Sequence, residues 1–275
     1  MINPRKNREI LQSAVFVSAL ISVVLGGVAC NRGGAETPSS TGAADAKMAT
    51  EKVADAEPLY EGREDMNKAR LAVTTLRQAH AADYGNYEAA WKLSRAAFYV
   101  ADRTDIDTER DNMFREGTEA GKAAAALQPN KPDGHFWLGA NYGGTAAHST
   151  LANLSSFNDI KTEMEAVLKL DEGYQGYSAY IGLGRLYLGA PRVLGGDVSK
   201  AIEYLEKGVK LNPNNTVTRY YLAEAYETAN RDADAKKQLE AIMTITPDPK
   251  YIAEHKDTLA KAKKLQEKMA ANLRG

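Results

Sequence analysis

Residues 211–249 read LNPNNTVTRYYLAEAYETANRDADAKKQLEAIMTITPDP and carry the plainest structural signal in the chain. Pro213 and Pro247 stand 34 residues apart, and each ends a helix because proline lacks a backbone N–H and collides with the preceding turn. Leu222 and Tyr226 are four residues apart, so they lie on one face of a helix. Together these positions predict a helix, a turn and a second helix between the two prolines.

The same spacing occurs one unit earlier in the chain. The apolar and small positions of the quoted segment are Leu222, Ala223, Tyr226, Ala235 and Leu239, and their earlier counterparts are Leu183, Gly184, Tyr187, Ala201 and Leu205. A third copy, HFWLGANYG at residues 135–143, keeps Leu138, Gly139 and Tyr142. Small side chains at these positions allow a neighbouring helix to approach closely, so the pattern predicts helices packed in pairs.

This spacing resembles the tetratricopeptide repeat, a helix–turn–helix unit of 34 residues. The resemblance spans roughly residues 64–247. It implies an all-α fold, a tetratricopeptide-like α-α superhelix in which helix pairs stack as a right-handed solenoid, because no single unit buries its own apolar face. We expect this repeat domain to occupy residues 59–275. The alternative is a helical bundle without solenoid geometry.

The C-terminal residues 248–275 predict one further helix. Lysines and acids surround an apolar stripe that consists of Tyr251, Ile252, Leu259, Leu265 and Met269. The end of a solenoid needs a polar outer face to stay soluble. We therefore expect this segment to be a C-terminal capping helix.

The first thirty residues predict a lipoprotein signal peptide. A basic start precedes an apolar run over residues 11–29, which is the order of an export signal. GVAC at residues 27–30 resembles a bacterial lipobox, although Gly27 stands where leucine is usual, and in that family the cysteine is acylated. Lipidation at Cys30 is therefore expected. The alternatives are an uncleaved anchor, since about 20 apolar residues span a bilayer, and an ordinary signal peptide.

Residues 31–58 predict a disordered linker between lipid and folded domain. They contain no aromatic and almost no large apolar side chain, so they cannot bury enough surface to offset their ordering entropy. Asn31, a residue other than aspartate after the cysteine, resembles the pattern that sends lipoproteins to the outer membrane. We therefore expect a periplasm-facing protein that is lipid-anchored to the bacterial cell envelope, at the outer membrane.

Composition and motifs argue against nucleic-acid binding, metal binding and catalysis. The chain has 35 Lys and Arg against 36 Asp and Glu, and so lacks the basic excess that neutralises phosphates. GTEAGKAA at residues 117–124 is not a phosphate loop, because Ala123 stands where Ser or Thr must bind magnesium. The histidines form no zinc motif; they are His80, His135, His148 and His255. No cofactor is expected, and the protein is predicted not to be an enzyme.

The sequence YLGAPRVLGGD at residues 187–197 interrupts the repeat. Tyr187 to Ala201 spans fourteen residues, whereas Tyr226 to Ala235 spans nine. Five extra residues therefore lie in the earlier turn. Because defined loops on rigid scaffolds often carry function, this loop is a candidate contact surface.

Three residues of this loop are candidate contact residues. Pro191 ends the preceding helix, while Gly195 and Gly196 allow backbone angles that are closed to other residues. Asp197 then caps the following helix by accepting hydrogen bonds from its free N–H groups. These features predict a defined turn.

The loop and its flanks resemble the TatT family, the T component of tripartite ATP-independent periplasmic (TRAP) transporters. The matching residues are Leu183, Gly184, Leu186, Tyr187, Pro191, Gly195, Gly196, Ala201 and Pro213. The resemblance implies a helical-repeat lipoprotein that associates with the solute-binding protein of the transporter and accepts or passes small, often apolar, ligands. A eukaryotic family of microtubule regulators has the same kind of stretch, but the lipobox favours the bacterial family.

The concave face of the solenoid supplies the other binding candidates. First helices line that face, and the spacing to the repeat leucines places Phe136, Arg185, Tyr220 and Glu224 there. This mixed surface could bind an extended peptide, a partner loop or a small acid. The alternative is that Arg185 and Glu224 simply pair across neighbouring helices.

Two functions of different classes follow from these observations. The first is a non-catalytic accessory of a TRAP-type transporter that binds a solute-binding protein and a small ligand. The second is a tetratricopeptide scaffold for cell-envelope assembly, such as outer-membrane protein insertion or pilus biogenesis. An enclosed apolar tunnel would favour the first, and a shallow polar groove would favour the second. An unrecognised enzyme, the third alternative, would require a buried cluster of acids and histidines. The oligomeric state is not predicted.

Overall fold

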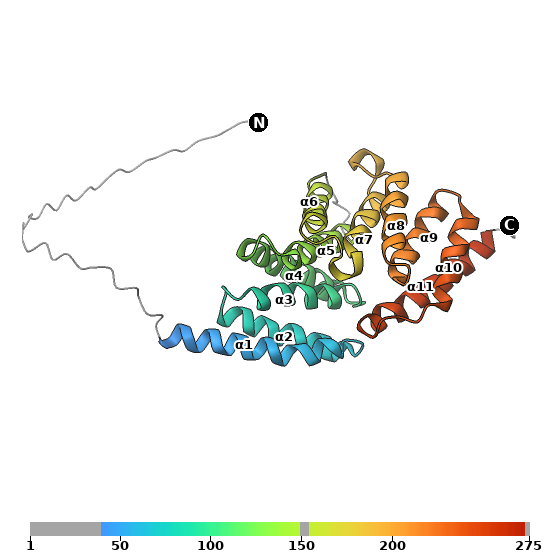
Figure 1. The fold of residues 1–275 in the computed structure, drawn as a ribbon. Helices are drawn as coiled ribbons and strands as arrows, with labels where there is room; N and C mark the ends of the chain where they lie inside the picture. Colours follow the sequence, from blue (N-terminus) through green and yellow to red (C-terminus); the bar gives the residue numbers. More distant parts are fainter. Residues whose placement is uncertain (1–39, 149–153, 273–275) are drawn as a thin grey trace, which may run out of the picture. The chain divides into compact units, whose positions relative to one another are not determined.

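The computed structural model describes residues 40–148 and 154–272 (Figure 1). Cys30, Asn31 and the predicted signal peptide lie outside the described residues, as do residues 31–39 of the predicted linker. All regular structure in the described part is helical, which confirms the predicted all-α class. None of the helices described is both long enough and apolar enough to cross a membrane.

Consecutive helices of the described chain form hairpins that stack in sequence order. The helices are α1 (Ser40–Glu61), α2 (Met66–Ala82), α3 (Tyr87–Ala101), α4 (Asp107–Leu127), α5 (Pro132–His148), α6 (Leu154–Leu170), α7 (Tyr174–Gly189), α8 (Val198–Leu211), α9 (Thr216–Thr228), α10 (Asp232–Thr244) and α11 (Ile252–Asn272), with the short 3-10 helices η1 (Arg192–Leu194) and η2 (Pro249–Tyr251).

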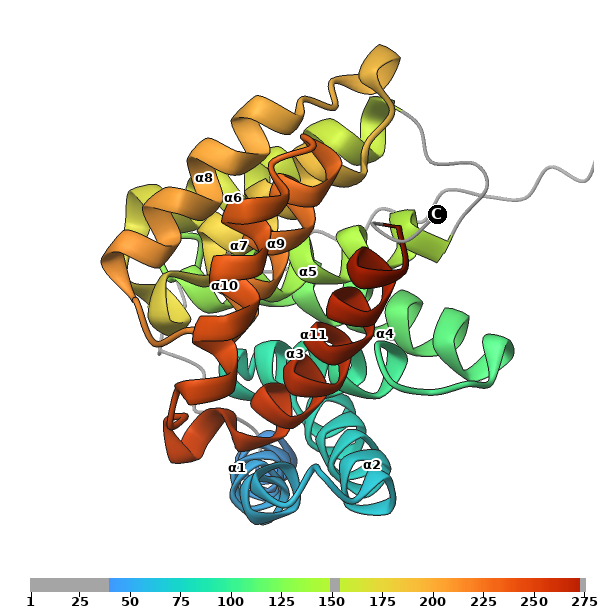
Figure 2. The same ribbon diagram turned by 90° about the vertical axis from the view of Figure 1, so that its right-hand side faces the viewer.

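The hairpins build a superhelix (Figures 1 and 2). Each first helix packs against its own hairpin partner and against the first helix of the next hairpin, in the order α1, α3, α5, α7 and α9. Apolar clusters continue along this stack: the first joins α1 to α4, the second joins α5 to α8, and the third joins α8 to α11. The core therefore consists of successive apolar clusters between neighbouring helices, as expected for stacked repeats.

Small residues bring the helices of each hairpin together. Leu205 of α8 and Leu239 of α10, at equivalent positions of consecutive hairpins, are both fully buried. A Cβ atom added at Gly184 of α7 would overlap the side chain of Leu205, and one added at Gly139 of α5 would lie 2.8 Å from the terminal carbon of Met164. The glycines of the repeat pattern therefore permit close helix packing, as expected.

The first helix corrects the predicted boundary between linker and domain. Helix α1 begins at Ser40, so residues 40–58 of the segment predicted as a disordered linker are helical. The reason is that Ala49, Val53 and Ala56, although small, repeat at helical spacing and are buried; Val53 and Ala56 pack in one apolar cluster with residues of α2. Small side chains at helical spacing therefore supply enough apolar contact to stabilise a helix when another helix lies directly against them.

Helix α11 joins the two ends of the superhelix, a role that goes beyond the predicted cap. Its length packs against α9 and α10. Its first turns carry Glu254, Lys256 and Asp257, which form ion pairs with Arg63, Glu64 and Arg103 respectively. Figure 2 shows α11 running between the last hairpin and the first three helices. Of its predicted apolar stripe, Leu265 is buried and Ile252 is exposed; Ala253 and Ala262, which were not part of that stripe, are buried as well.

Candidate functional site

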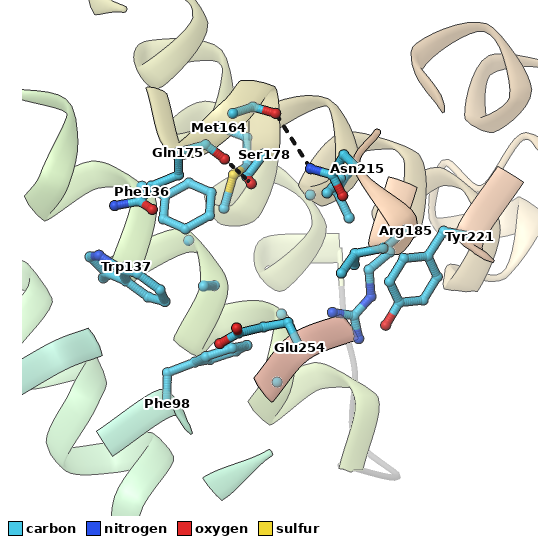
Figure 3. Close-up of a pocket in the computed structure, with 18 of the residues that line it drawn as sticks. Phe98, Phe136, Trp137, Met164, Gln175, Ser178, Arg185, Asn215, Tyr221 and Glu254 are labelled. Atoms are coloured by element: carbon cyan, nitrogen blue, oxygen red, sulfur yellow. Dashed lines mark hydrogen bonds between the residues drawn. The ribbon is translucent and has the colours of Figure 1, made fainter. Parts of the chain in front are cut away.

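A cavity of about 1610 Å³ lies on the inner side of the superhelix (Figure 3). Helices α5, α6, α7 and α9 supply one wall, and α1, α3 and residues 246–255 supply the other. Sites for drug-sized ligands typically measure about 300–1,000 Å³. The cavity is therefore large enough for a small ligand together with water, and α11 with its preceding segment covers one side of it.

Helix α5 forms a wall of two aromatic residues, Phe136 and Trp137, and several small residues. Phe136 lines the cavity and is buried among the apolar residues of α6 and α7. One and two turns further along the same face, Gly139, Ala140 and Gly143 leave the space in front of the helix open. A Cβ atom at Gly143 would meet nothing within 4 Å. The volume of the cavity thus arises partly because α5 carries small side chains where it faces inward.

Helix α7 presents a mixed face to the same cavity. Ser178, Ile181 and Arg185 recur at intervals of three and four residues, so they point inward from one side of the helix. Gly182 lies between them and is covered by the thioether of Met164 from α6. This face is apolar in its middle and cationic one turn later.

Arg185 is an unpaired cation inside the superhelix. Its side chain is accessible to the cavity, while the guanidinium lies 4.6 Å from the centre of the Tyr221 ring on α9. It forms no ion pair or hydrogen bond with any residue that the structure describes. The neighbouring Tyr221 is the main cause that raises the pKa of Arg185, and it outweighs the lowering by burial. Arg185 therefore stays charged at every physiological pH.

Arg185 and Glu224 form no direct ion pair in the described part of the chain, so the alternative that they simply pair with each other does not hold. Glu224 lines the cavity and accepts a hydrogen bond of 2.6 Å from the Tyr220 hydroxyl, one turn earlier on α9. Burial and this hydrogen bond raise the pKa of Tyr220. Glu224 attracts Arg185 only at longer range. Of the four predicted concave-face residues, Phe136, Arg185 and Glu224 line the cavity, whereas Tyr220 reaches it through Glu224.

The turn that opens α7 has strained backbone at the cavity wall. Gln175, Gly176 and Tyr177 have φ values of 48°, 66° and 70°, and left-handed backbone is costly for residues other than glycine. The side-chain amides of Asn212 and Asn215 both donate to the carbonyl of Gly176, at 3.3 and 3.4 Å. Such strain persists where surrounding contacts impose it, and it is frequent at binding sites.

Residues from η2 and α11 hold the opposite side of this turn. The Tyr251 hydroxyl donates to the Gln175 side-chain oxygen at 3.1 Å. His255, which is buried, makes a 3.2 Å hydrogen bond with the Thr216 hydroxyl at the start of α9. Burial lowers the pKa of His255, which favours its neutral form. The segment leading into α11 is thus hydrogen-bonded to both α7 and α9 around the cavity.

The other buried charges near the cavity have partners. Arg63 forms a bidentate pair with Glu254, at 2.9 and 3.0 Å. Glu57 pairs with Arg95 at 3.2 Å and with Lys92 at 3.0 Å. Burial would raise the pKa of Glu57, but these two cations lower it overall. The buried charges on and next to the first three helices are therefore paired with opposite charges, whereas Arg185 has no ion-pair partner among the described residues.

The predicted contact loop folds back on itself beside the cavity. Gly196 donates to the Pro191 carbonyl at 3.1 Å, and Asp197 donates to the Tyr187 carbonyl at 2.9 Å. Gly195 has a φ of 106°, and a Cβ atom at Gly196 would overlap the carbonyl oxygen of Ala190. Pro191 lines the cavity, whereas Gly195 and Gly196 shape the loop from behind.

Several lining residues were missed by the reasoning from sequence. Phe98, Trp137, Gln175, Tyr221 and Tyr251 all face the cavity (Figure 3) or line it. Tyr221 follows directly after the predicted Tyr220, and a helical wheel drawn through Arg185 of the previous repeat could have selected it. Nothing in the sequence signals that Tyr251 returns to meet α7.

No group of three or more potential metal ligands gathers in residues 40–148 or 154–272. Each histidine has its own separate surroundings. His135 bonds to Glu163 at 2.6 Å, His255 bonds to Thr216, and His80 and His148 contact aromatic rings. The cavity offers an inner surface for binding, where charged side chains such as Arg185 and Glu224 lie among apolar and aromatic groups.

Two family descriptions match separate parts of the chain. Residues 53–187, just under half of the 275 residues, match the family "Regulator of microtubule dynamics protein 1-3". Residues 194–254 match the tetratricopeptide repeat. The second match includes α8, α9 and α10 and thus the segment with the 34-residue spacing. The chain is a tetratricopeptide-repeat protein, while its resemblance to the TatT family remains a prediction.

Solved structures of two bacterial proteins are similar to this one. A thermophilic tetratricopeptide-repeat protein of Thermus thermophilus is 18% identical, with a TM-score of 0.55 over 77% of this chain and 99% of that chain. PilF of Pseudomonas aeruginosa is 16% identical, with a TM-score of 0.50 over 80% and 93%. At these identities the likeness concerns the fold, and it confirms the tetratricopeptide-like superhelix. No curated protein matches the sequence.

Proposed function

We propose that this protein is a non-catalytic accessory of a TRAP-type solute transporter, with a role like that of the T component. It binds a small ligand in the cavity of its superhelix and associates with a periplasmic solute-binding protein. In this proposal Cys30 carries the lipid that anchors the protein to the envelope, facing the periplasm from the outer membrane, and residues 31–39 form the remaining tether. The proposal includes no cofactor, metal or nucleic acid.

The cavity carries this proposal. Its volume of about 1610 Å³ lies between α5, α6, α7 and α9 on one side and α1, α3 and residues 246–255 on the other. Gly139, Ala140 and Gly143 keep the space in front of α5 empty, although larger side chains there would add apolar contact and stability. A cavity that is kept open at the expense of core packing supports ligand binding.

The contact loop supports the protein-binding part of the proposal. Val193 at its tip is 90% exposed, and the loop is held rigid by its own backbone hydrogen bonds. An exposed apolar side chain on a rigid loop can enter a pocket of a partner without a large loss of entropy. A tetratricopeptide scaffold for envelope assembly is the second candidate function, and the same loop would serve it.

Affinity capture would separate the two candidates. The full-length tagged protein is crosslinked in its native envelope and purified, and its partners are identified by mass spectrometry, with Val193→Asp as a matched variant that disrupts the loop tip. Recovery of a solute-binding protein that decreases in Val193→Asp would support the transporter role. Recovery of envelope-assembly proteins without a solute-binding protein would overturn it and leave the scaffold.

The anchor needs a separate test, since it concerns residues at the chain start. Cells that express the full chain are labelled with a clickable palmitate analogue, and Cys30→Ser is the control. We expect label on the wild type and none on Cys30→Ser. Equal label on both, or label on neither, would contradict lipidation at Cys30.

A further inference from the structure

We infer that the superhelix opens and closes along a seam between α11 and the first three helices, and that this seam is the gate to the cavity. The seam joins the first turns of α11, residues 252–258, to the turn between α1 and α2, residues 62–65, and the turn between α3 and α4, residues 102–106. Opening of the seam can be measured with no ligand present, so the gate goes beyond the proposed function and can fail independently of it.

Two arginines on the side of the first three helices hold carboxylates of α11 across the seam. The Arg63 guanidinium contacts both carboxylate oxygens of Glu254, at 2.9 and 3.0 Å, and Arg103 lies 2.6 Å from an oxygen of Asp257. Both guanidinium groups also lie over the ring of Tyr99, at 5.5 Å for Arg63 and 3.8 Å for Arg103. This ring stabilises the two cations on their own side of the seam. They therefore stay in place when the carboxylates move away.

A third ion pair crosses the seam with the charges exchanged. Lys256 of α11 lies 2.7 Å from a carboxylate oxygen of Glu64, so here the cation belongs to α11. If α11 closed in a shifted position, side chains of like charge would face each other, which is unfavourable. The alternating charges therefore define one closed position to which the seam returns after opening.

Helix α11 buries far less apolar surface at the seam than on its other side. Among its described residues, Ala253 alone belongs to the apolar cluster of α1 to α4. On the other side, Ala262 and Leu265 are buried in the cluster of α8 to α11, and His255 bonds to Thr216 of α9. Apolar burial stabilises in proportion to its area, whereas exposed ion pairs contribute little. When the seam opens, α11 therefore stays with α9 and α10.

Open space lies beside the seam as well as within the superhelix. A second cleft, of about 570 Å³, is lined by residues 61–65 and by residues of the segment 249–253. The residues that line both this cleft and the cavity are Glu61, Arg63, Pro249 and Lys250. Arg63 closes this shared wall by donating to the Lys250 carbonyl at 2.8 Å. Separation of Arg63 from Lys250 and Glu254 would therefore connect the cleft to the cavity.

The stacked hairpins allow the seam to part without breaking the core. Each hairpin packs against the hairpins before and after it, so small rotations at successive interfaces add up along a repeat array. Only the ion pairs and the small contact at Ala253 need to be given up. The seam is thus the weakest contact around the cavity.

Two buried alanines on α11 offer a direct measurement of the opening. Ala253→Cys lies at the seam and Ala262→Cys lies among residues of α9 and α10, and both alanines are buried. The full chain in lipid nanodiscs is treated with N-ethylmaleimide, which is uncharged, and peptide mass spectrometry gives the modification rate at each position. The wild type gives the background from Cys30. Because cysteine is close to alanine in size, both variants should fold.

Salt should open the seam selectively. Raising sodium chloride from about 0.05 M to about 1 M shortens the Debye length to about 3 Å and weakens ion pairs. We expect modification of Ala253→Cys to become at least about threefold faster, because the seam depends on charge. Modification of Ala262→Cys should not change, since apolar contacts hold that side of α11.

A charge reversal and its rescue locate the effect at the seam. Lys256→Glu places two acids opposite each other, and at low salt it should speed the modification of Ala253→Cys at least about threefold. Adding Glu64→Lys, 192 residues away, restores an ion pair and should return the rate to that of the parent. Lys268→Gln is the control and should not change the rate, because its 2.8 Å pair with Glu227 joins α11 to α9.

The contrary outcomes are distinct. A rate at Ala253→Cys that responds to neither salt nor Lys256→Glu would overturn the gate. Equal acceleration at Ala262→Cys would show that α11 detaches or unfolds as a whole, which would overturn it as well. Failure of Glu64→Lys to restore the rate would show that α11 frays instead of parting from the first three helices. In each case the proposed function would still be decided by the affinity capture.

Discussion

The hairpins α7–α8 and α9–α10 are consecutive copies of one repeat, yet only one of them is regular. Both bury the same pattern, with Leu183 and Leu205 in the first and Leu222 and Leu239 in the second. The regular hairpin opens at the Asn215 cap and has a short turn. The other begins with three left-handed residues and ends its first helix in the longer loop.

The irregular hairpin supplies a large part of the cavity wall. Gln175 from its left-handed turn, Arg185 from its helix and Pro191 from its loop all line the cavity. The regular hairpin contributes Tyr221 and Glu224 from an ordinary helical face. The comparison indicates that the core positions of the repeat hold the fold, while the departures from regularity shape the site.

Truncating the two equivalent leucines should produce the largest effects. Leu205→Ala and Leu239→Ala each remove a fully buried side chain, which typically costs about 2–5 kcal/mol of the free energy of unfolding. Similar losses, measured by chemical denaturation, would show that the two hairpins share one core despite their different turns. A cost below about 1 kcal/mol in one of them would contradict equal packing.

Gly196→Ala should break the irregular loop without touching the core. The added methyl group would overlap the Ala190 carbonyl oxygen, so the loop must shift. We expect a loss of about 1–3 kcal/mol in the free energy of unfolding, the usual range for overpacking. Gly189→Ala is the matched control, because its methyl group would meet nothing within 4 Å. Equal stability of the two variants would show that the loop tolerates an outward shift.

Asn215 connects the regular hairpin to the irregular one, and two substitutions separate its roles. Its side chain caps α9 by accepting from the Thr218 N–H at 3.1 Å, and it also donates to the Gly176 carbonyl. Asn215→Ala loses both and should cost about 1 kcal/mol or somewhat more. Asn215→Asp keeps the cap and loses only the donor, so it should cost less. Thermal unfolding would rank the two, and the reverse order would contradict these roles.

The contact between α11 and α9 should make stability depend on pH. Burial lowers the pKa of His255 in the folded protein below 6.5, the ordinary value that it keeps in the unfolded chain. At a pH between the folded-state and the unfolded-state pKa, the unfolded chain therefore binds more protons than the folded protein. Stability is then fully present above about pH 6.5 and decreases as the pH falls below it. His255→Gln should flatten this decrease between about pH 7 and pH 5.

A second histidine, His80, provides a comparison for this prediction. Burial also lowers the pKa of His80, at the end of α2 and away from α11. His255→Gln should therefore leave a residual pH dependence, and His80→Gln should remove a different part of it. Urea midpoints measured at several pH values would test both. An unchanged slope in His255→Gln would show that the α11 contact does not sense protonation.

The repeat and most of the fold could be predicted from the sequence alone, because helical periodicity and proline spacing are local signals. The same signals predicted that Pro191 ends α7 and that Asp197 caps α8, and the structure confirms both. The predicted domain start was wrong: α1 is an alanine-rich helix whose stability comes from packing on α2, and composition alone resembled a linker.

Local sequence also placed Phe136, Arg185 and Glu224 on the inner face, since that position follows from the spacing to the repeat leucines. Tertiary structure was needed for the rest of the site. Only the path of the whole chain brings Tyr251 to Gln175 and Glu254 to Arg63, across 76 and 191 residues. Whether Arg185 is paired or free likewise depends on side chains from other helices. The reason is physical: periodicity fixes which face a residue occupies, whereas enclosure and charge compensation depend on contacts between distant segments.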